Sequence, residues 1–385
     1  MRREEYARFE APPREYYQQA IENVLTKIDG NLETFQDKVP APASYNLVYE
    51  AIDNIYWTAS FWSGMLWLAY EITGDAKYRR VAEAQLQLHR RRLEERVNID
   101  THDLGFLYSL SGVTAFKLTG NEGAKDLAVK AAESLSGRYW ERAGIIQAWG
   151  MMDEPEERGR MIIDCLLNLP LLYWASEVTG NTRYREMAYN HVCQNARYIV
   201  RQDASTFHTF FLDVETGRPI VGKTHQGFSD DSCWARGQAW GIYGFPLSYR
   251  YTEDWRLIEV AKRLSNYFIN RLPEDQVPYW DLIFDSGVER DSSAAAIACC
   301  GLLELSRHLP LADSSKRIYE NAALSILSSL TDGYTTKTVP HSNGVLLHGL
   351  QHKPKGLGVD ECCIWGDYYY FEALVRVVKD WKPYW

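Results

Sequence analysis

The sequence predicts an all-α protein in which six helical hairpins close into a ring, an (α/α)₆ barrel or six-hairpin toroid. Three observations predict this fold. A phrase centred on Thr-Gly repeats along the chain, apolar and amphipathic helical segments alternate, and polar residues gather just before the apolar segments. The chain has 385 residues and no linker rich in Pro, Gly or Ser. We therefore expect residues 1–385 to form a single domain.

The repeated phrase marks helical hairpins. Its three clearest copies are "LAYEITGDAKYRRVAEAQL" from Leu68, "AFKLTGNEGAKDLAVKAAESL" from Ala115 and "WASEVTGNTRYREMAYNHV" from Trp174. In each copy the Gly suits the left-handed end of one helix, and the Asp or Asn that follows suits the N-cap of the next. Looser copies without the Gly start at Leu247 and Leu303.

Two kinds of helix alternate along the chain. Amphipathic helices with one charged face are predicted near residues 14–28, 75–95, 122–136, 181–200, 254–272 and 313–330. Apolar helices rich in small and aromatic residues are predicted near 60–72, 104–118, 166–178, 238–251, 292–306 and 366–380. Because a helix that is apolar on most sides must be buried, the apolar set should line the ring and the amphipathic set should surround it. The longer connections, 201–230 and 331–360, are predicted to be rim loops with short strands.

Composition excludes membrane and secreted classes. An apolar content of 46% and a charged content of 24% are those of a globular protein, and no apolar run approaches the roughly 20 residues that cross a bilayer. The charged start, "MRREEYARFEAPPREYYQQA", lacks the apolar region of a secretory signal. Seven cysteines, an odd number with two adjacent pairs, favour reduced thiols in the cytoplasm.

Charge and histidine spacing exclude two further classes. A net charge of −9 opposes binding to nucleic acid. The one basic run, "HRRRLEER" (89–96), is predicted to be a solvated helix face. The nine histidines form no metal-binding pattern, so we expect no metal.

The segments before the apolar helices are predicted to form the mouth of the ring, because all inner helices of a toroid run in the same direction. These segments are "NIYWTASFW" (54–62), "NIDTHDLGF" (98–106), "AWGMMDEPEERGRMIID" (148–164), "DDSCWARGQAW" (230–240), "GVERDSSA" (287–294) and "GVDECCIWGDYYY" (358–370). Each contains Trp, Asp or both. The chain has 13 Trp and 25 Tyr, and flat aromatic rings suit the faces of sugars.

Asp164 is the strongest candidate for a catalytic residue. Pro170 predicts a helix start between about 168 and 170, so Asp164 lies at the mouth, somewhat far upstream for an ordinary cap. Its neighbours are apolar, and an ionised carboxylate without a function would be costly there. For Asp103, a helix cap and a functional acid remain open as alternatives.

A buried carboxyl group beside a second one has a raised pKa. A pair with one protonated and one ionised member can cleave glycosidic bonds or add water to activated double bonds. Arg236 is the expected cation of the mouth, suited to bidentate contact with a carboxylate, which implies a sugar acid. The expected stacking platform is Trp57, Trp149, Trp234 and Trp240.

Five motifs resemble the unsaturated glucuronyl hydrolases of glycoside hydrolase family 88. They are "WTASFWSGMLWLAYEITGD" (57–75), "THDLGFLYSLS" (101–111), "RMIIDCLLNLPLLYWASEVTGN" (160–181), "DDSCWARGQAWGIYGF" (230–245) and "GVDECCIWGDYYYFEAL" (358–374). The resemblance implies an (α/α)₆ barrel without a cofactor. It also implies an enzyme that removes the Δ4,5-unsaturated uronic acid from the non-reducing end of lyase-generated glycosaminoglycan or related oligosaccharides, by hydration of the C4=C5 double bond.

The resemblance also implies roles for single residues. Asp164 matches the general acid and base, and Asp103 matches an acid that assists at the ring hydroxyls. The residues that match the lining of the sugar site are Trp57, His102, Trp149, His208, Gln226, Trp234, Arg236 and Trp240. Some relatives carry serines and a lysine that recognise a sulfated second sugar, whereas "HGLQHKPKGLGVDE" (348–361) has two lysines and no serine. A preference for sulfated substrates is therefore not predicted. The oligomeric state is not predicted from the sequence either.

Three other functions compete with this interpretation. An unsaturated rhamnogalacturonyl hydrolase would share the toroid and the mechanism but act on pectin fragments. A sugar epimerase would share the toroid but use histidines as its acid and base, whereas Asp residues are central here. A non-catalytic helical-repeat scaffold would not need acids that converge at one end.

Overall fold

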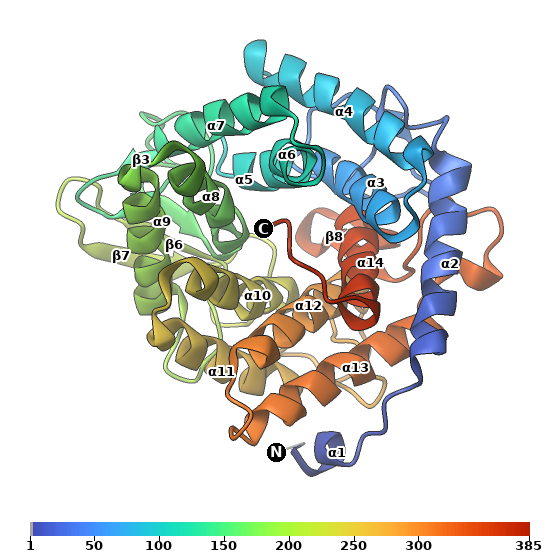
Figure 1. Ribbon diagram of the computed structural model, residues 1–385. Coiled ribbons are helices and arrows are strands. Elements are labelled where there is room, and N and C mark those ends of the chain that lie inside the picture. The colour runs from blue at the N-terminus through green and yellow to red at the C-terminus, as the bar shows by residue number, and fades with distance from the viewer. Residues whose placement is uncertain (1–2) are drawn as a thin grey trace.

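The structure, a computed structural model that describes residues 3–385, is a ring of two concentric layers of helices (Figure 1). In this part of the chain the inner layer has six members: α3 (Ala59–Thr73), α5 with α6 (Leu104–Tyr108 and Thr114–Thr119), α8 (Leu169–Thr179), α10 (Ala235–Thr252), α12 (Ser292–His308) and α14 (Ile364–Val378). The outer layer is α2 (Arg14–Asn31), α4 (Ala76–Glu94), α7 (Glu122–Ser136), α9 (Thr182–Gln194), α11 (Trp255–Ile269) and α13 (Ser315–Gly333). The predicted toroid is confirmed. A short helix that was not predicted, α1 (Arg3–Ala7), lies beside α13.

The two layers differ in burial as their sequences predict. In inner helix α12 the buried positions run almost without a break from Ser292 to Ser306. In outer helix α11 a single stripe is buried, consisting of Leu257, Ile258, Ala261, Leu264, Ser265, Phe268 and Ile269. The inner helices therefore form the core between the ring axis and the outer layer.

The Thr-Gly phrases end and restart helices as expected. Gly74, Gly120 and Gly180 have φ of +72°, +69° and +75°, and each donates its N–H to a carbonyl four residues back. A Cβ on any of them would meet no atom within 4 Å, so the left-handed backbone rather than lack of space favours glycine. The residues that follow, Asp75 and its equivalents Asn121 and Asn181, accept N-cap hydrogen bonds.

Two inner helices are irregular near the mouth. Between α5 and α6 the chain forms a π-helical turn, Ser109–Val113. Before α8 it forms a 3₁₀ turn, Ile163–Leu167, and α8 then begins at Leu169 with Pro170 in its first turn. The predicted helix start is confirmed, and Asp164 lies just before it.

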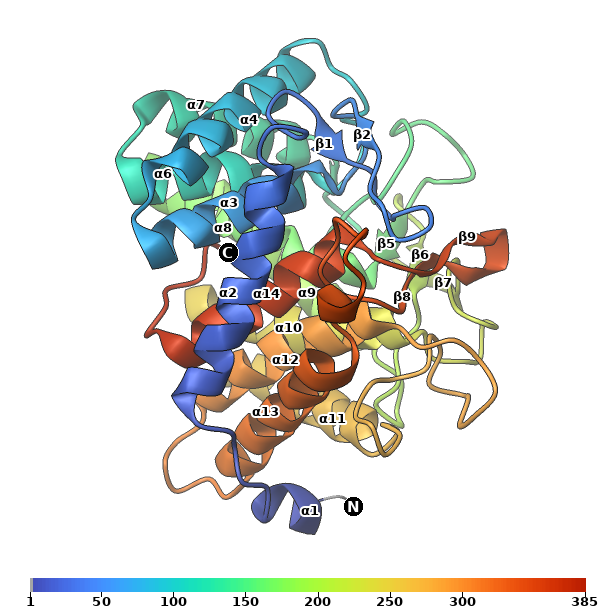
Figure 2. The same ribbon diagram turned by 90° about the vertical axis from the view of Figure 1, so that its right-hand side faces the viewer.

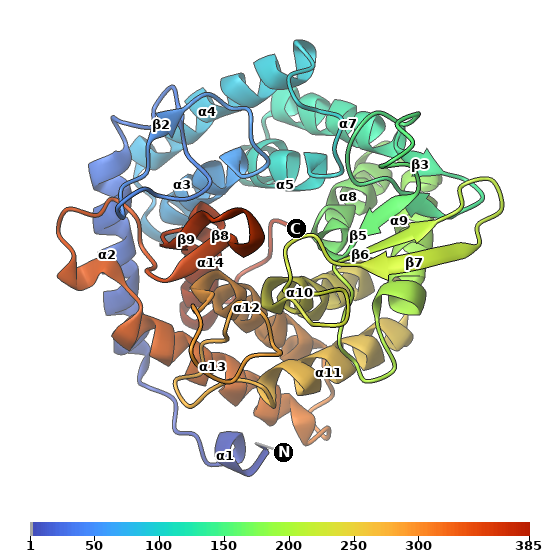
Figure 3. The same ribbon diagram turned by 180° about the vertical axis from the view of Figure 1, so that it is seen from behind.

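Short antiparallel strands gather at one end of the ring (Figures 2 and 3). Within residues 3–385 they form one three-stranded sheet, β5-β6-β7 (Arg160–Ile162, Thr209–Leu212, Pro219–Lys223), and three pairs: β1-β2 (Val39–Pro40, Ala51–Ile52), β3-β4 (Tyr139–Trp140, Ile145–Ile146) and β8-β9 (Gly349–His352, Leu357–Glu361). Strands in the two long connections were predicted. The strands β1 to β5 were not, because two or three residues are too short for alternation to be visible.

The prediction that the basic run 89–96 is a solvated helix face is confirmed for Arg91, Glu94, Glu95 and Arg96, which are exposed, and is wrong for His89 and Arg92. His89 and Arg92 are buried, because the helical period places them on the same side of α4 as buried Gln85. Arg92 donates hydrogen bonds to backbone carbonyls of two connecting segments, at Tyr56 (2.6 Å) and Asn98 (3.0 Å) among others. It therefore fixes two segments that lead to the mouth.

The segment after α14 returns to the ring axis, where the chain end is visible at the centre of Figure 1. Trp381, Tyr384 and Trp385 are buried there. Across the described range 3–385, no helix has both the length and the apolarity needed to span a membrane.

Candidate active site

Asp103 and Asp164 meet at the end of the ring where the inner helices begin. Asp103 directly precedes α5, and Asp164 lies in the 3₁₀ turn before α8. The Nε2 atom of His102 is 3.4 Å from Oδ1 of Asp103 and 3.5 Å from Oδ1 of Asp164. The two carboxyl side chains are only 10% and 14% exposed. The fold therefore places two nearly buried acids against one imidazole ring.

Asp103 does not use its side chain as a helix cap, so the capping interpretation is wrong. Its carboxylate accepts a hydrogen bond from the Thr101 hydroxyl (2.7 Å) and none from the first turn of α5. Asn168 joins the two acid-bearing segments: it accepts a hydrogen bond from the Phe106 N–H (2.6 Å) and donates to the carbonyl of Asp164 (3.3 Å). Gly105 permits this contact, because a Cβ there would lie 2.2 Å from Asn168 Cα.

Asp164 is in surroundings that favour its protonated form. Its Oδ1 atom is buried and has no hydrogen-bond partner among residues 3–385. Burial raises the pKa of Asp164 well above its ordinary value, and the negative charge of Asp103 raises it further, while Arg236 opposes the shift.

Asp103 ionises more easily than Asp164. Burial raises the pKa of Asp103 to about 6, and the Thr101 hydrogen bond with the charges of Arg92 and Arg138 limits the rise. The surroundings of the pair therefore favour a state with Asp103 ionised and Asp164 protonated, which is the state that general acid catalysis requires.

Two histidines of the site are neutral. Burial, with a contribution from Arg138, lowers the pKa of His102 to about 3. Burial also lowers the pKa of His208 well below its ordinary value. The Nδ1 atom of His208 accepts the N–H groups of His225 and Gln226, both at 3.0 Å, so its hydrogen is on Nε2. In the described part of the chain this Nε2 has no partner, which leaves a donor for a ligand.

Arg236 is not free to form the expected bidentate contact, and that prediction is wrong. Its guanidinium forms an ion pair with Asp291 (2.7 Å) and donates to Gln226 Oε1 (2.9 Å) and to the carbonyls of Leu350 and Gln351. Asp291 is fully buried at the start of α12 and requires a counterion. Arg236 instead orients Gln226 and contributes positive potential to the mouth.

The four predicted tryptophans divide into two classes. Trp57 and Trp149 are partly exposed: the Trp57 ring packs 5.3 Å from Trp365, and the Trp149 ring packs 5.1 Å from His225. Trp234 and Trp240 are 3% and 1% exposed. The prediction that all four tryptophans form one stacking platform is therefore wrong for the second pair, which is packed too deeply to offer a ring face.

Sequence reasoning missed several residues of the site. Thr101, Asn168, His225 and Trp365 contact predicted site residues. Thr101, Asn168 and Trp365 stand inside quoted motifs, and His225 precedes Gln226. The available signal was therefore their nearness in sequence to predicted site residues and, for Asn168, its polarity in an apolar segment. Lys353, from the segment related to sulfate recognition, forms an ion pair with Glu289.

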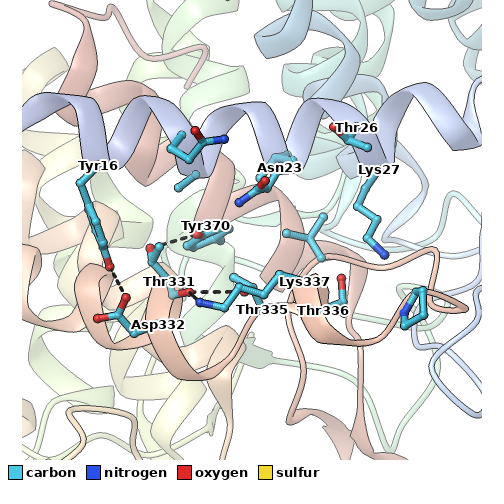
Figure 4. Close-up of a pocket in the computed structure, with 15 residues that line it drawn as sticks. Tyr16, Asn23, Thr26, Lys27, Thr331, Asp332, Thr335, Thr336, Lys337 and Tyr370 are labelled. Atoms are coloured by element: carbon cyan, nitrogen blue, oxygen red, sulfur yellow. Dashed lines mark hydrogen bonds between the residues drawn. The ribbon is translucent and has the colours of Figure 1, made fainter.

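A separate pocket of about 350 Å³ lies on the outer wall, between α2 and the end of α13 (Figure 4). Tyr16, Asn23, Lys27 and Lys337 line it, and no predicted site residue does so within the described chain. In residues 3–385 no group of three or more His, Cys, Asp or Glu side chains could hold a metal ion.

A known enzyme family matches most of the chain. The profile of Glycosyl Hydrolase Family 88 matches residues 27–369. The chain belongs to this family. As a family 88 member it is a glycoside hydrolase, and the resemblance predicted from five motifs is confirmed.

Individual relatives of this family 88 chain cover nearly all of it. It is 47% identical over 369 residues to the unsaturated chondroitin disaccharide hydrolase of Streptococcus pneumoniae (95% of this chain, 93% of the relative). It is 46% identical over 371 residues to the unsaturated glucuronyl hydrolase of Bacillus sp. strain GL1 (96% and 98%). The crystal structure of the Streptococcus agalactiae unsaturated glucuronyl hydrolase superposes with a TM-score of 0.96 at 46% identity, covering 100% of this chain and 96% of that one. A mutant of the S. agalactiae enzyme, in complex with dGlcA-GalNAc6S, has a TM-score of 0.89 at 43% identity (100% and 97%).

Proposed function

We propose that this enzyme removes the Δ4,5-unsaturated uronic acid from the non-reducing end of lyase-generated glycosaminoglycan or related oligosaccharides by hydrating the C4=C5 double bond. One observation carries the proposal: the nearly buried carboxyl of Asp164 has a raised pKa and lies next to a second acid that ionises more easily. An acid that is neutral at pH 7 can deliver a proton to carbon. The names of the most similar relatives support the same chemistry.

Asp164 acts twice in the proposed reaction. It donates its proton to C4 of the enol ether as the double-bond electrons form the new C–H bond, and positive charge develops at C5 and the ring oxygen. Water then adds at C5 and loses a proton to Asp164, which restores the acid. The resulting hemiketal opens and releases the second sugar as an alcohol.

Asp103 acts by its charge and its acceptor oxygens. It accepts hydrogen bonds from the O2 and O3 hydroxyls of the unsaturated sugar, and its carboxylate stabilises the cationic transition state by a few kcal/mol, roughly the scale of one well-placed charged group. Its hydrogen bond from Thr101 keeps it in position.

The other predicted residues bind the sugar in the same proposal. Trp57 and Trp149 supply the accessible ring faces, and His208 donates from Nε2. Arg236 attracts the sugar carboxylate through its potential and through the Gln226 amide that it orients, and not by a bidentate contact. Buried Trp234 and Trp240 support these groups from behind.

We also propose that the chain works in the cytoplasm as a single catalytic domain. The support is that all seven cysteines are unpaired, six of them buried, within the described residues. A continuous hydrophobic core that includes residues from Tyr6 to Trp385 supports the single domain.

The direct test follows the ultraviolet absorbance of the conjugated double bond. We expect an unsaturated chondroitin disaccharide to lose this absorbance with the enzyme, and an unsaturated rhamnogalacturonan fragment to react much more slowly. In D₂O the product should carry deuterium at C4. Release of the second sugar with an intact double bond, or without deuterium at C4, would contradict the proposed hydration, and faster turnover of the pectin fragment would indicate the competing substrate class.

A further inference from the structure

We propose that Trp385 is a positioning residue for the acid pair. It lies in a plug, residues Asp380–Trp385, that closes the ring at the end opposite the mouth, and it acts on the site through Phe106. The inference rests on the proposed function, because turnover is one of its readouts.

The plug is bound to several inner helices at once. Trp381 Nε1 and Tyr384 OH both donate to Oε2 of Glu71 on α3, at 3.0 and 2.8 Å. Lys117 of α6 donates to the carbonyl of Tyr384 (2.8 Å), and Arg307 of α12 donates to the carbonyl of Trp381 (2.9 Å). These contacts fix the plug to three members of the inner layer.

Trp385 is the part of the plug that reaches toward the mouth. It is 1% exposed, and its Nε1 donates to Oε2 of Glu372 (2.9 Å). Its ring lies nearly parallel to that of Tyr369, with centroids 6.0 Å apart and 14° between the planes. Its edge meets Phe106 at 6.0 Å and 87°.

Phe106 connects this ring to the site. Its own ring packs 5.3 Å from Trp57 and 5.4 Å from Trp240. Its backbone N–H donates to Asn168, which donates to the carbonyl of Asp164. Asp103 stands three residues before Phe106 at the start of the same helix. A shift of Phe106 would therefore displace Trp57, the proposed sugar-stacking ring, and both acids.

The helix that carries Phe106 depends on such support. α5 has five residues and passes directly into a π-helical turn. A helix this short is not stable by itself, so its position is set by the side chains packed around it. Removing the Trp385 ring would open a cavity below Phe106, into which the start of α5 could relax.

The experiment compares Trp385→Leu and Trp385→Phe with Trp381→Leu. Trp381 is equally buried in the same plug, but its contacts are with Glu71, Tyr384 and Arg376 and not with Phe106. Each variant is assayed on the unsaturated disaccharide well below its own Tm. Trp385→Leu should lower kcat by about 10- to 100-fold, because small displacements of catalytic groups cost this much. It should also move the alkaline limb of the pH profile to lower pH, since the acids move apart and repel each other less.

The two other variants make the comparison specific. Trp385→Phe, which keeps a ring against Phe106, should retain kcat within about threefold. Trp381→Leu should lower Tm with kcat and the pH profile unchanged. If Trp385→Leu does not fold, Trp385→Met gives the same comparison with an unbranched, flexible side chain that fills an irregular gap more readily.

An activity-independent readout separates this inference from the proposed function. Infrared titration of the Asp164 carboxyl should give a lower pKa in Trp385→Leu than in the parent protein. A folded Trp385→Leu with unchanged kcat, pH profile and Asp164 titration would overturn the inference, and so would an equal effect of Trp381→Leu. A parent enzyme without activity on unsaturated sugars would overturn the proposed function alone, because the titration would still test the positioning.

Discussion

The two ends of the inner ring each contain a pair of acids that are buried or nearly so, and one acid of each pair has a pKa shifted in the opposite direction from that of the other. At the mouth, Asp164 lies beside Asp103 and its pKa is raised. At the base, Arg376 forms ion pairs with Glu304 (2.8 Å) and Glu372 (2.9 Å). Burial alone would raise the pKa of Glu304, but Arg376, together with His308 and Arg250, holds it well below its ordinary value.

The difference shows that burial alone does not decide the charge of a carboxyl group in this protein. The contacting counterion does. Glu304 and Glu372 are paired and serve the closure of the ring, whereas Asp164 has an oxygen with no partner in the described structure. An acid that is buried, unpaired and next to a second acid is destabilised in its charged form, and that state suits it to donate a proton.

The first test of this contrast makes the same chemical change, acid to amide, at each end of the ring. Asp164→Asn removes the proposed proton donor, and we expect kcat to fall by about 10³- to 10⁴-fold with the fold intact. Glu304→Gln at the base should lower Tm and leave kcat within about twofold of the parent enzyme. The measurement is the loss of double-bond absorbance for both variants with circular dichroism as the folding check, and equal kcat losses would refute the division of roles.

The second test removes the counterion at the base. Arg376→Met removes the cation that contacts both Glu304 and Glu372, which leaves Glu304 with His308 and Arg250 and leaves Glu372 with neutral donors such as Trp385. Breaking a buried ion pair in this way costs about 3–5 kcal/mol. Denaturant unfolding measures the cost. A loss below about 1 kcal/mol would mean that Glu304 does not depend on Arg376 for its charge, and the contrast with the mouth would be lost.

The third test removes the second acid at the mouth. In Asp103→Asn the negative charge that helps to raise the Asp164 pKa is gone. The alkaline limb of the pH profile of kcat/KM should therefore move to lower pH, and kcat should fall by about 10²-fold as the transition-state charge is lost. A lower kcat with an unmoved alkaline limb would show that the two acids are not coupled.

The smallest expected effect is an opposite pH dependence of stability at the two ends. The raised pKa of Asp164 makes a contribution to the free energy of unfolding that depends on pH. This contribution is complete below a pH of about 4, the ordinary pKa of the group, and is lost as the pH rises toward the pKa in the folded state. Asp164→Asn should therefore match the parent Tm at pH 4 and exceed it by about 2–4 °C at pH 8.

The contribution of Glu304 to stability changes with pH in the opposite direction. Because its pKa is lowered in the folded state, its contribution is present above the ordinary pKa of a glutamate and is lost as the pH falls. The Tm deficit of Glu304→Gln should therefore be largest at neutral pH and shrink in acid. Thermal unfolding of both variants from pH 4 to pH 8 measures this, and slopes of the same sign would contradict the account.

The sequence predicted what depends on local pattern. Helical periodicity located both layers, and Pro170 with the apolar neighbours of Asp164 located the acid. Contacts between side chains and residues far away in the sequence were not predictable. Arg236 pairs with a residue 55 positions away and with a carbonyl 114 positions away. The sequence therefore does not reveal that the donors of its guanidinium are already occupied.

The depth at which a side chain is buried within its layer of helices also could not be predicted from the sequence. Trp57 and Trp240 both stand in motifs at the mouth, but only the packing of neighbouring helices leaves one ring partly exposed and the other buried. Arg92 looked solvated because its own helix is amphipathic, while the carbonyls that it binds come from segments before and after that helix.

The central claim is that Asp164 is protonated at neutral pH because it is buried beside Asp103 without a contacting cation. The most direct measurement is the infrared difference spectrum between the parent protein and Asp164→Asn at pH 7, with ¹³C-labelled aspartate to assign the bands. We predict that the variant loses the C=O band of a protonated carboxyl group. Loss of a carboxylate band instead would contradict the account.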